Sequence, residues 1–322
     1  MNHSSLAPRV ALGVALAAIP SAAFAQAHLL VPGGPGGGWD TTARGVGEAL
    51  VKSGVEPRVS FQNMSGGGGG KAIAYLIEAG TKRGEIFMVN STPIVIRALS
   101  GRIPYSHHDL IPVASVVADF GAFVVRTDSP LKTWADAVEQ YRRAPRTLTV
   151  AGGSARGSMD HLVLVHALEA SGTEGIKVPY IPYDAGGKAK AGLLSGEVAM
   201  LSTGFSEALD LMNGGQARIL AMTAPELAEG YETIPTLKSL GIDMTFTNWR
   251  GFFTSKEMAV DRVKAFSDKL KEMMKSESWA KIRKRNGWQD LFRDRAGFEK
   301  LLAEQEADMS RLLTRLGFIE EK

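Results

Sequence analysis

The sequence predicts an α/β protein with two lobes that face a ligand cleft, followed by a helical C-terminal tail. After residue 26, short apolar runs alternate with helical stretches, a pattern typical of βαβ units and mostly parallel sheets. The alternation starts again near Pro112, which indicates a second α/β unit, and amphipathic helices replace it from Val260 onward. Because ligands of open α/β sheets bind beyond the carboxyl ends of strands, we expect the cleft at those ends.

The first unit contains three predicted strands and two predicted helices. The strands are the apolar runs at 28–31, 58–61 and 85–90, and the helices lie at 40–52 and 71–79. We expect Asp40 or Thr41 to cap the first helix, because a short oxygen-bearing side chain can accept a hydrogen bond from an unpaired backbone N–H.

The second unit and the tail are read in the same way. Strands are predicted at 113–117, 121–126, 147–151, 177–181, 197–202, 218–223 and 251–254, and helices at 133–141, 159–170, 187–195, 260–275, 278–285 and 295–316. The last helix repeats its apolar residues at close to 3.6 positions, and Gly317 is a plausible stop. We expect lobe I to comprise residues 26–118 and 226–322, and lobe II to comprise residues 119–225.

The length and composition limit which classes of protein this chain can belong to. At 322 residues the chain is long enough for two domains with their own cores. It contains no cysteine, which excludes disulfides and thiolate chemistry. The formal net charge of +3 is close to balanced, so we expect no nucleic-acid partner.

Residues 1–25 have the features of a secretory signal peptide. Arg9 precedes the apolar run 10–19, Pro20 interrupts it, and Ala23-Phe24-Ala25 matches an A-x-A cleavage site. The run is too short to span a bilayer as a helix. We therefore expect export of the chain and removal of this segment.

Three glycine-rich turns, each followed by a helix-start signal, are the most informative motifs. They lie at 33–38, 66–70 and 152–158. Without Cβ atoms, backbone N–H groups can approach a ligand closely. A helix that begins at such a turn adds unpaired N–H groups and a partial positive charge. These turns predict a site for a small anion, most plausibly a carboxylate.

The motifs of other chemistries are incomplete. Trp39 replaces the third glycine of a dinucleotide fingerprint, and Ala72 replaces the hydroxyl residue of a phosphate loop. Arg156 stands where a nucleophile elbow needs glycine. The adjacent side chains of His107 and His108 diverge and lack a second ligand pair, so we expect a solvated turn rather than a metal site. We predict no cofactor and no metal.

Three stretches, in order and at these spacings, carry a resemblance to a known family. They are Val31 to Arg44, with a GGGWD-x-x-AR pattern, Gly152 to Leu162, and Tyr183 to Ala189 with Leu194 to Val198. The chain resembles the substrate-binding receptors of tripartite tricarboxylate transporters, also called Bug receptors. The resemblance implies a two-lobed periplasmic-binding-protein fold (type II-like), no enzymatic activity, and closure on a di- or tricarboxylate. It also implies delivery to an integral-membrane permease, and we expect a monomer.

The resemblance also implies which loops bind the ligand. In the family, the first loop and the second-lobe glycine turn hold one carboxylate largely through backbone N–H groups and ordered waters. Carried over to this sequence, the binding residues are Gly33, Gly34, Gly36, Gly37 and Gly38 on one side, and Gly153, Ser154, Arg156, Gly157 and Ser158 on the other. The five glycines at 66–70 depart from the family's proline–glycine–alanine–glycine–glycine sequence. Asn63, which precedes this turn, is expected to keep its place.

Several side chains are candidates on chemical grounds. Trp39 could form a wall of the pocket or pack the first helix, and Arg156 could pair with a distal carboxylate through two hydrogen bonds. Polar residues at predicted strand ends would point into the cleft. These are Ser91, Thr92, Tyr183, Asp184 and Ser202.

Two other functions compete with a solute receptor. A secreted enzyme acting on an organic acid would need a general base, for which Asp184 and His161 are the candidates. A sensor would present its ligand-bound form to a kinase ectodomain. We regard a periplasmic receptor for a small carboxylate as the leading hypothesis.

Overall fold

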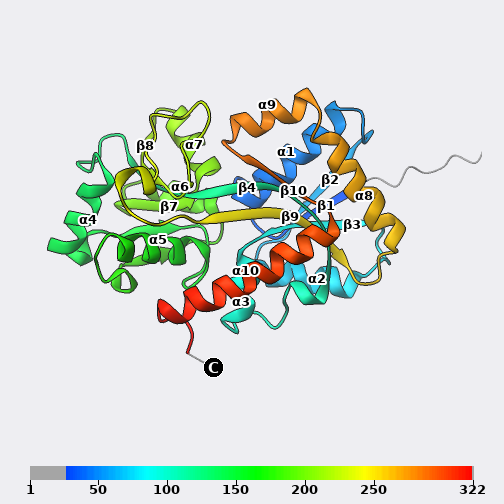
Figure 1. Cartoon of the computed structure of the whole chain (residues 1–322), viewed down its shortest axis with the longest axis horizontal. Helices are drawn as coiled ribbons and strands as arrows, with labels where there is room; N and C mark the ends of the chain where they lie inside the picture. The colour runs from blue at the N-terminus through cyan, green and yellow to red at the C-terminus, as the bar shows by residue number, and fades with distance from the viewer. Residues whose placement is uncertain (1–26, 321–322) are drawn as a thin grey trace, which may run out of the picture.

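The computed structural model describes residues 27–320, which form two α/β halves joined by long strands (Figure 1). The predicted signal peptide lies outside the described residues. Within them, the main strand order is β2-β1-β3-β9-β4-β7-β5-β6, and β10 and β8 also pair with β4. None of the described helices combines the length and the apolar character needed to cross a bilayer.

The first half contains a mixed sheet. Strand β1 (Ala27–Val31) pairs in parallel with β2 (Val59–Asn63) and β3 (Ile86–Ser91). Strand β9 (Thr247–Ser255) continues the sheet antiparallel to β3. Helices α1 (Gly38–Lys52), α2 (Gly70–Ala79) and α3 (Pro93–Leu99) follow β1, β2 and β3 along the chain.

The second half repeats the α/β pattern. Strand β7 (Met200–Gly204) lies between β4 (Leu110–Arg126) and the parallel strands β5 (Val150–Gly152) and β6 (Tyr180–Pro182), and β8 (Ala217–Met222) also pairs with β4. Helices α5 (Met159–Ala170), α6 (Gly186–Leu194) and α7 (Phe205–Asn213) each begin near the carboxyl end of a strand. Helix α4 (Trp134–Arg143) lies at the far end of this half (Figure 1).

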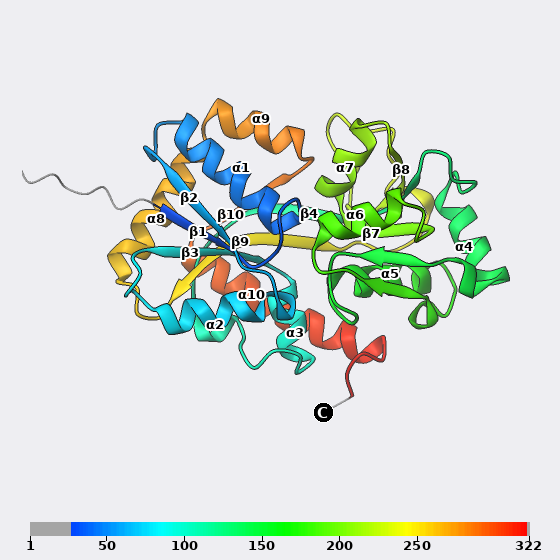
Figure 2. The same cartoon turned by 180° about the vertical axis from the view of Figure 1, so that it is seen from behind.

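Strand β4 joins the two halves. Its residues 110–120 pair with β9, whereas residues 121–126 pair with β7 and β8. Figure 2 shows β4 and β9 running together from one half to the other. We keep the predicted lobe boundaries as a proposal, supported by the position at which β4 changes partners.

The C-terminal segment completes the first half and reaches the second. Helices α8 (Val260–Met273) and α9 (Glu277–Arg285) pack beside α1, and strand β10 (Gln289–Arg293) pairs with β4. Helix α10 (Arg295–Arg315) packs against α3 and β4. Its far end approaches α5, where Arg315 lies 3.9 Å from Glu169.

Alternating side chains on β1 explain why the sheet of the first half is covered on both faces. Leu29 and Val31 pack with α1, α8 and α9, whereas Leu30 packs in the cluster that contains α2, α3 and α10. A parallel strand buried on both faces is apolar at nearly every position. The predicted fold class is confirmed, but α3, α7 and β10 were not predicted, and the predicted strands at 113–117 and 121–126 are one strand.

Candidate functional site

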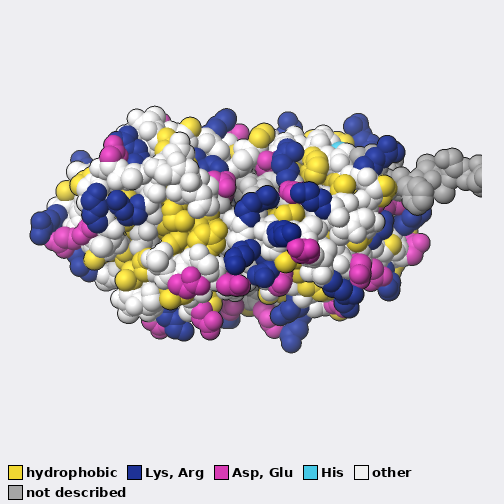
Figure 3. Space-filling model, turned by 90° about the horizontal axis from the view of Figure 1, so that it is seen from above, with side chains coloured by type: hydrophobic (Ala, Val, Ile, Leu, Met, Phe, Trp, Pro, Cys, Tyr) yellow, Lys and Arg dark blue, Asp and Glu magenta, His cyan; other side chains and the backbone are white. Residues whose placement is uncertain are grey.

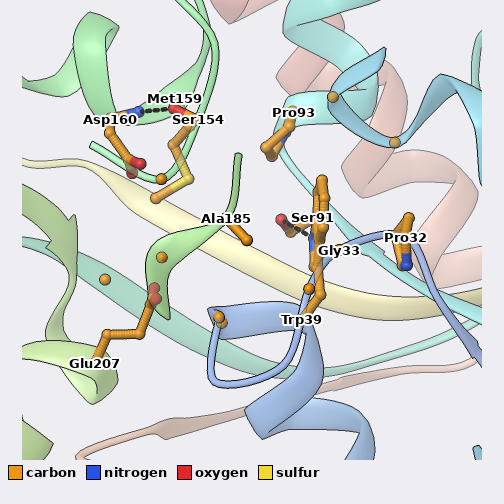
Figure 4. Close-up of a pocket in the computed structure, with 18 of the residues that line it drawn as sticks. Pro32, Gly33, Trp39, Ser91, Pro93, Ser154, Met159, Asp160, Ala185 and Glu207 are labelled. Atoms are coloured by element: carbon orange, nitrogen blue, oxygen red, sulfur yellow. Dashed lines mark hydrogen bonds between the residues drawn. The ribbon is translucent and has the colours of Figure 1, made fainter. Parts of the chain in front are cut away.

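A cavity of about 100 Å³ lies between the two halves, and we call it the central cavity. The first half contributes the β1–α1 loop, the glycine turn before α2 and the end of β3. The second half contributes the turns before α5, α6 and α7, and β9 adds Asn248 and Arg250. Figure 4 shows Trp39 and Ser91 on one side of the cavity and Asp160 and Glu207 on the other.

Helix N-termini surround this cavity, and none of them is capped by the side chain of its own N-cap residue. Helices α1, α2, α5, α6 and α7 each place a residue of their first turn, or the residue just before it, in the lining, and none has a side-chain hydrogen bond at its N-cap. Helices α4, α9 and α10 start elsewhere and are capped by Thr133, Ser276 and Asp294. Helix α8 is an uncapped exception outside the cavity. Two first-turn N–H groups do have side-chain acceptors: that of Asp160 donates to Ser154 Oγ at 3.0 Å, and that of Ser206 donates to Asp119 Oδ1 at 3.3 Å. The other N–H groups at these helix ends and the helix dipoles favour an anion.

Asp40 stabilises the first glycine loop through hydrogen bonds and does not cap helix α1. The N-cap of α1 is Gly37, so the prediction of an Asp40 or Thr41 cap was wrong. Asp40 accepts hydrogen bonds from the Gly36 N–H (3.0 Å), Asn63 Nδ2 (2.9 Å) and Arg44 Nε (2.9 Å). Burial alone would raise the pKa of Asp40, but these hydrogen bonds outweigh it and lower the pKa.

Trp39 forms a wall of the cavity and is fixed by its own indole. Its Nε1 donates to Ser91 Oγ at 2.9 Å, which ties α1 to the end of β3. A Cβ on Gly33 would lie 3.1 Å from the Trp39 ring, so the loop backbone packs directly on the indole. Trp39 therefore serves both roles that the sequence left open, since it also packs against the core beside α1.

The loops of the two halves touch across the cavity. A Cβ on Gly34 would lie 3.2 Å from the Ala185 methyl carbon, and one on Gly37 would lie 3.4 Å from the Gly186 nitrogen. A Cβ on Gly187 would lie only 2.8 Å from the Pro35 carbonyl oxygen. Glycine therefore permits the close approach of two main chains, and the two halves are closed on each other at this point.

The second-lobe glycine turn is held by hydrogen bonds within its own half. Ser154 Oγ accepts from the Asp160 N–H at 3.0 Å, and Arg156 Nη2 donates to the Tyr180 carbonyl oxygen at 2.5 Å. The Gly157 N–H donates to His161 Nδ1 at 3.0 Å. Burial, with a smaller contribution from Arg156, lowers the pKa of His161 to about 4, so the ring is neutral and accepts this bond near neutral pH.

The predicted site residues fall into three groups. The central cavity is lined by Gly33, Gly34, Gly37, Gly38, Trp39, Ser91, Gly153, Ser154 and Asp184. An adjoining cavity of about 330 Å³ is lined by Ser158 and Tyr183, and it shares Trp39, Gly153, Ser154 and Asp184 with the first. Outside both linings are Gly36, Asn63, Thr92, Arg156, Gly157 and Ser202.

The residues outside the linings have visible structural partners. Thr92 Oγ1 donates to Gln305 Oε1 at 3.1 Å, and Ser202 Oγ donates to the Asp160 carbonyl oxygen at 2.8 Å. Asn63 Nδ2 also donates to the Gly33 carbonyl oxygen at 2.9 Å. These side chains hold loops and helices that line the cavity, and their direct contact with a ligand stays a prediction.

Several lining residues were absent from the predicted site. Asp160, Glu207, Asn248 and Arg250 line the central cavity, and Arg97 lines the adjoining one. Glu207 and Arg97 belong to helices that were not predicted. Asp160 directly follows the second-lobe glycine turn, and this position is the signal that could have found it.

Arg250 is held by a buried ion pair where the two halves meet. Its guanidinium pairs with Asp119 of β4, and the two side chains are 3% and 0% exposed. Asp119 also accepts from the Ser206 hydroxyl at 2.8 Å. The guanidinium occupies the space that a Cβ on Gly38 would fill, so the first helix starts directly against this charge.

Within residues 27–320, one group of side chains has the ligand types and proximity for a metal ion, and it lies outside both cavities. His107, His108 and Glu306 place their ligand atoms within 4.8 Å of one another. His108 Nε2 lies 3.0 Å from Glu306 Oε2, a distance typical of a hydrogen bond. His107 is buried, so the prediction of a solvated turn was wrong for this residue.

A cavity between two α/β halves, with helix N-termini facing it, is typical of solute-binding proteins. The model of the tripartite tricarboxylate transporter family receptor (TctC) matches residues 43–318, and the chain belongs to this family. Its members are receptors and not enzymes, as the sequence predicted.

Relatives and solved structures agree with this assignment. The chain is 28% identical to protein BugT of Bordetella pertussis over 251 residues, which cover 75% of each chain. The periplasmic binding protein BugD matches 91% of this chain and 98% of its own, with a TM-score of 0.82 and 19% identity. MatC of Rhodopseudomonas palustris, solved with bound malate, matches 89% of this chain and 98% of its own, with a TM-score of 0.78 and 18% identity.

Proposed function

We propose that this protein captures a small organic carboxylate in the central cavity and delivers it to a tripartite membrane transporter from the periplasm. The observation that carries the proposal is the set of five helix N-termini around one cavity between the two halves. Preorganised N–H donors bind a carboxylate without the cost of ordering flexible side chains. The malate in MatC is a dicarboxylate, which places this class of ligand within a protein of the same fold.

The surface supports a small-molecule ligand over a nucleic acid. Lys and Arg side chains gather near the middle of the face seen from above (Figure 3). Helix α9, on that side of the molecule, carries four basic residues that are each within 4.0 Å of an acidic partner. The pairs are Lys281–Glu277, Arg283–Asp290, Lys284–Glu229 and Arg285–Glu48. Basic side chains that are paired with acids in this way attract the phosphates of a nucleic acid only weakly.

Ligand screening tests the proposal. Citrate, malate, succinate and longer dicarboxylates are added at about 10 mM, and the thermal midpoint is measured. A ligand present at about 100 times its dissociation constant stabilises the folded state by about 2.7 kcal/mol, which raises the midpoint by several degrees. If no carboxylate raises the midpoint, the proposed function is wrong.

A glycine variant tests the position of the site. A Cβ on Gly153 would collide with the backbone of Gly186, so Gly153→Ala is expected to displace the start of α6 and weaken binding at least tenfold. Gly214→Ala adds the same methyl at an exposed position at the end of α7 and should bind as the wild type does. Unchanged affinity in Gly153→Ala would place the ligand elsewhere.

A further inference from the structure

Two histidines and one glutamate meet outside both cavities, where the turn before β4 contacts α10. His107 and His108 belong to the 3₁₀ helix η2 (His107–Asp109), and Glu306 lies on α10. The sequence predicted that the two adjacent rings diverge, but their centroids lie 4.0 Å apart and their planes are tilted by 36°. The third ligand group, which the sequence lacked nearby, comes from a residue 198 positions after His108.

The distances within this cluster fit a shared metal ion. Glu306 Oε2 lies 3.0 Å from His108 Nε2 and 3.8 Å from His107 Nε2. Bonds from zinc to nitrogen and carboxylate oxygen are about 2.0–2.2 Å long, so tetrahedral geometry places neighbouring ligand atoms about 3.3–3.6 Å apart. The two distances to the carboxylate oxygen bracket this range. The carboxylate is therefore placed to share one ion with both rings.

The His107 ring is buried without a hydrogen bond from the described residues. Its side chain is 6% exposed, and its Nδ1 has no partner among them. Its Nε2 faces Glu306 Oε2 across 3.8 Å, which is too long for a hydrogen bond. A buried polar group without a partner costs free energy. A cation bound between this ring and the carboxylate would give Nε2 the partner that it lacks.

Both sides of the cluster are held in place by their own hydrogen bonds. On η2, Ser106 Oγ accepts from the His108 N–H at 3.1 Å, and Asp109 Oδ2 accepts from the Ser106 N–H at 2.7 Å, which together form a capping box. On α10, Gln305 directly precedes the acidic ligand and accepts from Thr92 Oγ1 at 3.1 Å. Ligands on two fixed elements need little rearrangement to hold an ion.

The chemistry of the donors selects the class of metal. Two imidazole nitrogens and one carboxylate oxygen suit Zn²⁺, whereas Mg²⁺ and Ca²⁺ prefer ligand sets made of oxygen. The His108 side chain is exposed and that of Glu306 is partly exposed. An ion can therefore enter from solvent, and water can complete its coordination.

We propose that His107, His108 and Glu306 form a zinc site that fastens the turn before β4 to α10. Both elements span the molecule, because β4 joins the two halves and α10 approaches α5 of the second half. The inference goes beyond the proposed function and does not depend on it, since the three ligands lie outside both cavities.

Zinc titration of the protein without a polyhistidine tag tests the inference. Calorimetry with zinc chloride in metal-free buffer should show one ion bound per chain, and magnesium chloride at the same concentration should give no binding heat. Zinc should also raise the thermal midpoint, because an ion that binds only the folded chain stabilises it. Absence of zinc binding overturns the inference and leaves the carboxylate proposal standing.

Variants of each ligand assign the ion to this cluster. His108→Gln and Glu306→Gln should each weaken zinc binding at least tenfold, as should His107→Phe, which keeps a flat ring in the buried position. Glu304→Gln removes an exposed carboxylate from the same helix and should bind zinc as the wild type does. Circular dichroism checks that each variant is folded.

Two outcomes of the variant series would contradict the proposed site. Unchanged zinc affinity in both His108→Gln and Glu306→Gln would place the ion elsewhere. Loss of affinity in these two variants but not in a folded His107→Phe would mean that only a surface pair binds the ion, which overturns the three-ligand site. If His107→Phe does not fold, the other two variants decide.

Discussion

At the scale of single residues, Ala185 is the most informative position. Its φ of 92° and ψ of 152° lie in a region that is almost confined to glycine, and no other non-glycine residue among those described has a positive φ. Its methyl carbon faces Gly34 across the cavity. The strain is therefore located in the loop that closes on the first glycine turn, where it narrows the space left for a ligand.

We predict that Ala185→Gly stabilises the protein. Removing the Cβ relieves a backbone strain of about 1–3 kcal/mol, which exceeds the loss of about 0.4–1 kcal/mol from the greater freedom of glycine in the unfolded chain. Urea unfolding measures the difference. Ala191→Gly, at an exposed position in the same helix α6, should instead destabilise by about 0.5–1 kcal/mol. A destabilised Ala185→Gly would mean that the methyl contact matters more than the strain.

At the scale of elements, β4 decides how the halves are joined. The sequence predicted two strands, 113–117 and 121–126, with Asp119 in the gap between them and Gly121 at the start of the second. The strand continues because each has a tertiary reason: Asp119 pairs with Arg250 of β9, and Gly121 lets Val163 of α5 pack against the strand. A buried charge is tolerated in a strand when a partner on the neighbouring strand neutralises it.

We predict that Asp119→Ala destabilises the protein by about 3–5 kcal/mol, because it leaves the guanidinium of Arg250 buried without a partner. Adding Arg250→Met removes that charge and should recover a measurable part of the loss in urea unfolding. A double variant no more stable than Asp119→Ala would show that packing, and not the isolated charge, accounts for the effect.

At the scale of the whole molecule, buried titratable groups set the dependence of stability on pH. Burial is the main cause that lowers the pKa of His107, His161 and His166 to about 4 each. Between pH 6.5 and 4 the unfolded chain therefore binds protons at these rings that the folded chain does not. Asp160 and Glu207 act in the opposite sense, because their raised pKa values let the folded chain hold protons that the unfolded chain releases.

Burial also raises the pKa of Glu169, whereas the lowered pKa values of Asp40 and Glu48 act in the same sense as those of the histidines. Five groups therefore oppose three, and we predict that stability falls as pH decreases from 6.5 to 4. A net uptake of about one proton on unfolding corresponds to about 1.4 kcal/mol per pH unit. Urea unfolding at several pH values measures the slope. Asp160→Asn removes one opposing group and should make the fall steeper. A stability that rises toward pH 4 would mean that the acids dominate or that the histidines are already charged in the folded protein.

Local chemistry in the sequence determined much of this protein. Alternating apolar runs gave the α/β class, the glycine turns marked where main chains approach one another, and the motif spacing pointed to the receptor family. Positions such as Gly153 and Trp39 could be found because their roles depend on the adjacent backbone and helix start. The predicted strands and helices are therefore mostly correct in type, with shifts of a few residues at their ends.

Only the tertiary structure decided which side chains meet at the cavity. Glu207, Arg97 and Arg250 come from three elements far apart in the chain, and the local sequence does not show that they line neighbouring cavities. Whether each of these side chains is buried, and whether it has a hydrogen-bond or ion-pair partner, depends on how β4 and β9 bring the halves together. Charge in a closed site is a long-range property of packing, whereas a glycine turn is a property of a few consecutive residues.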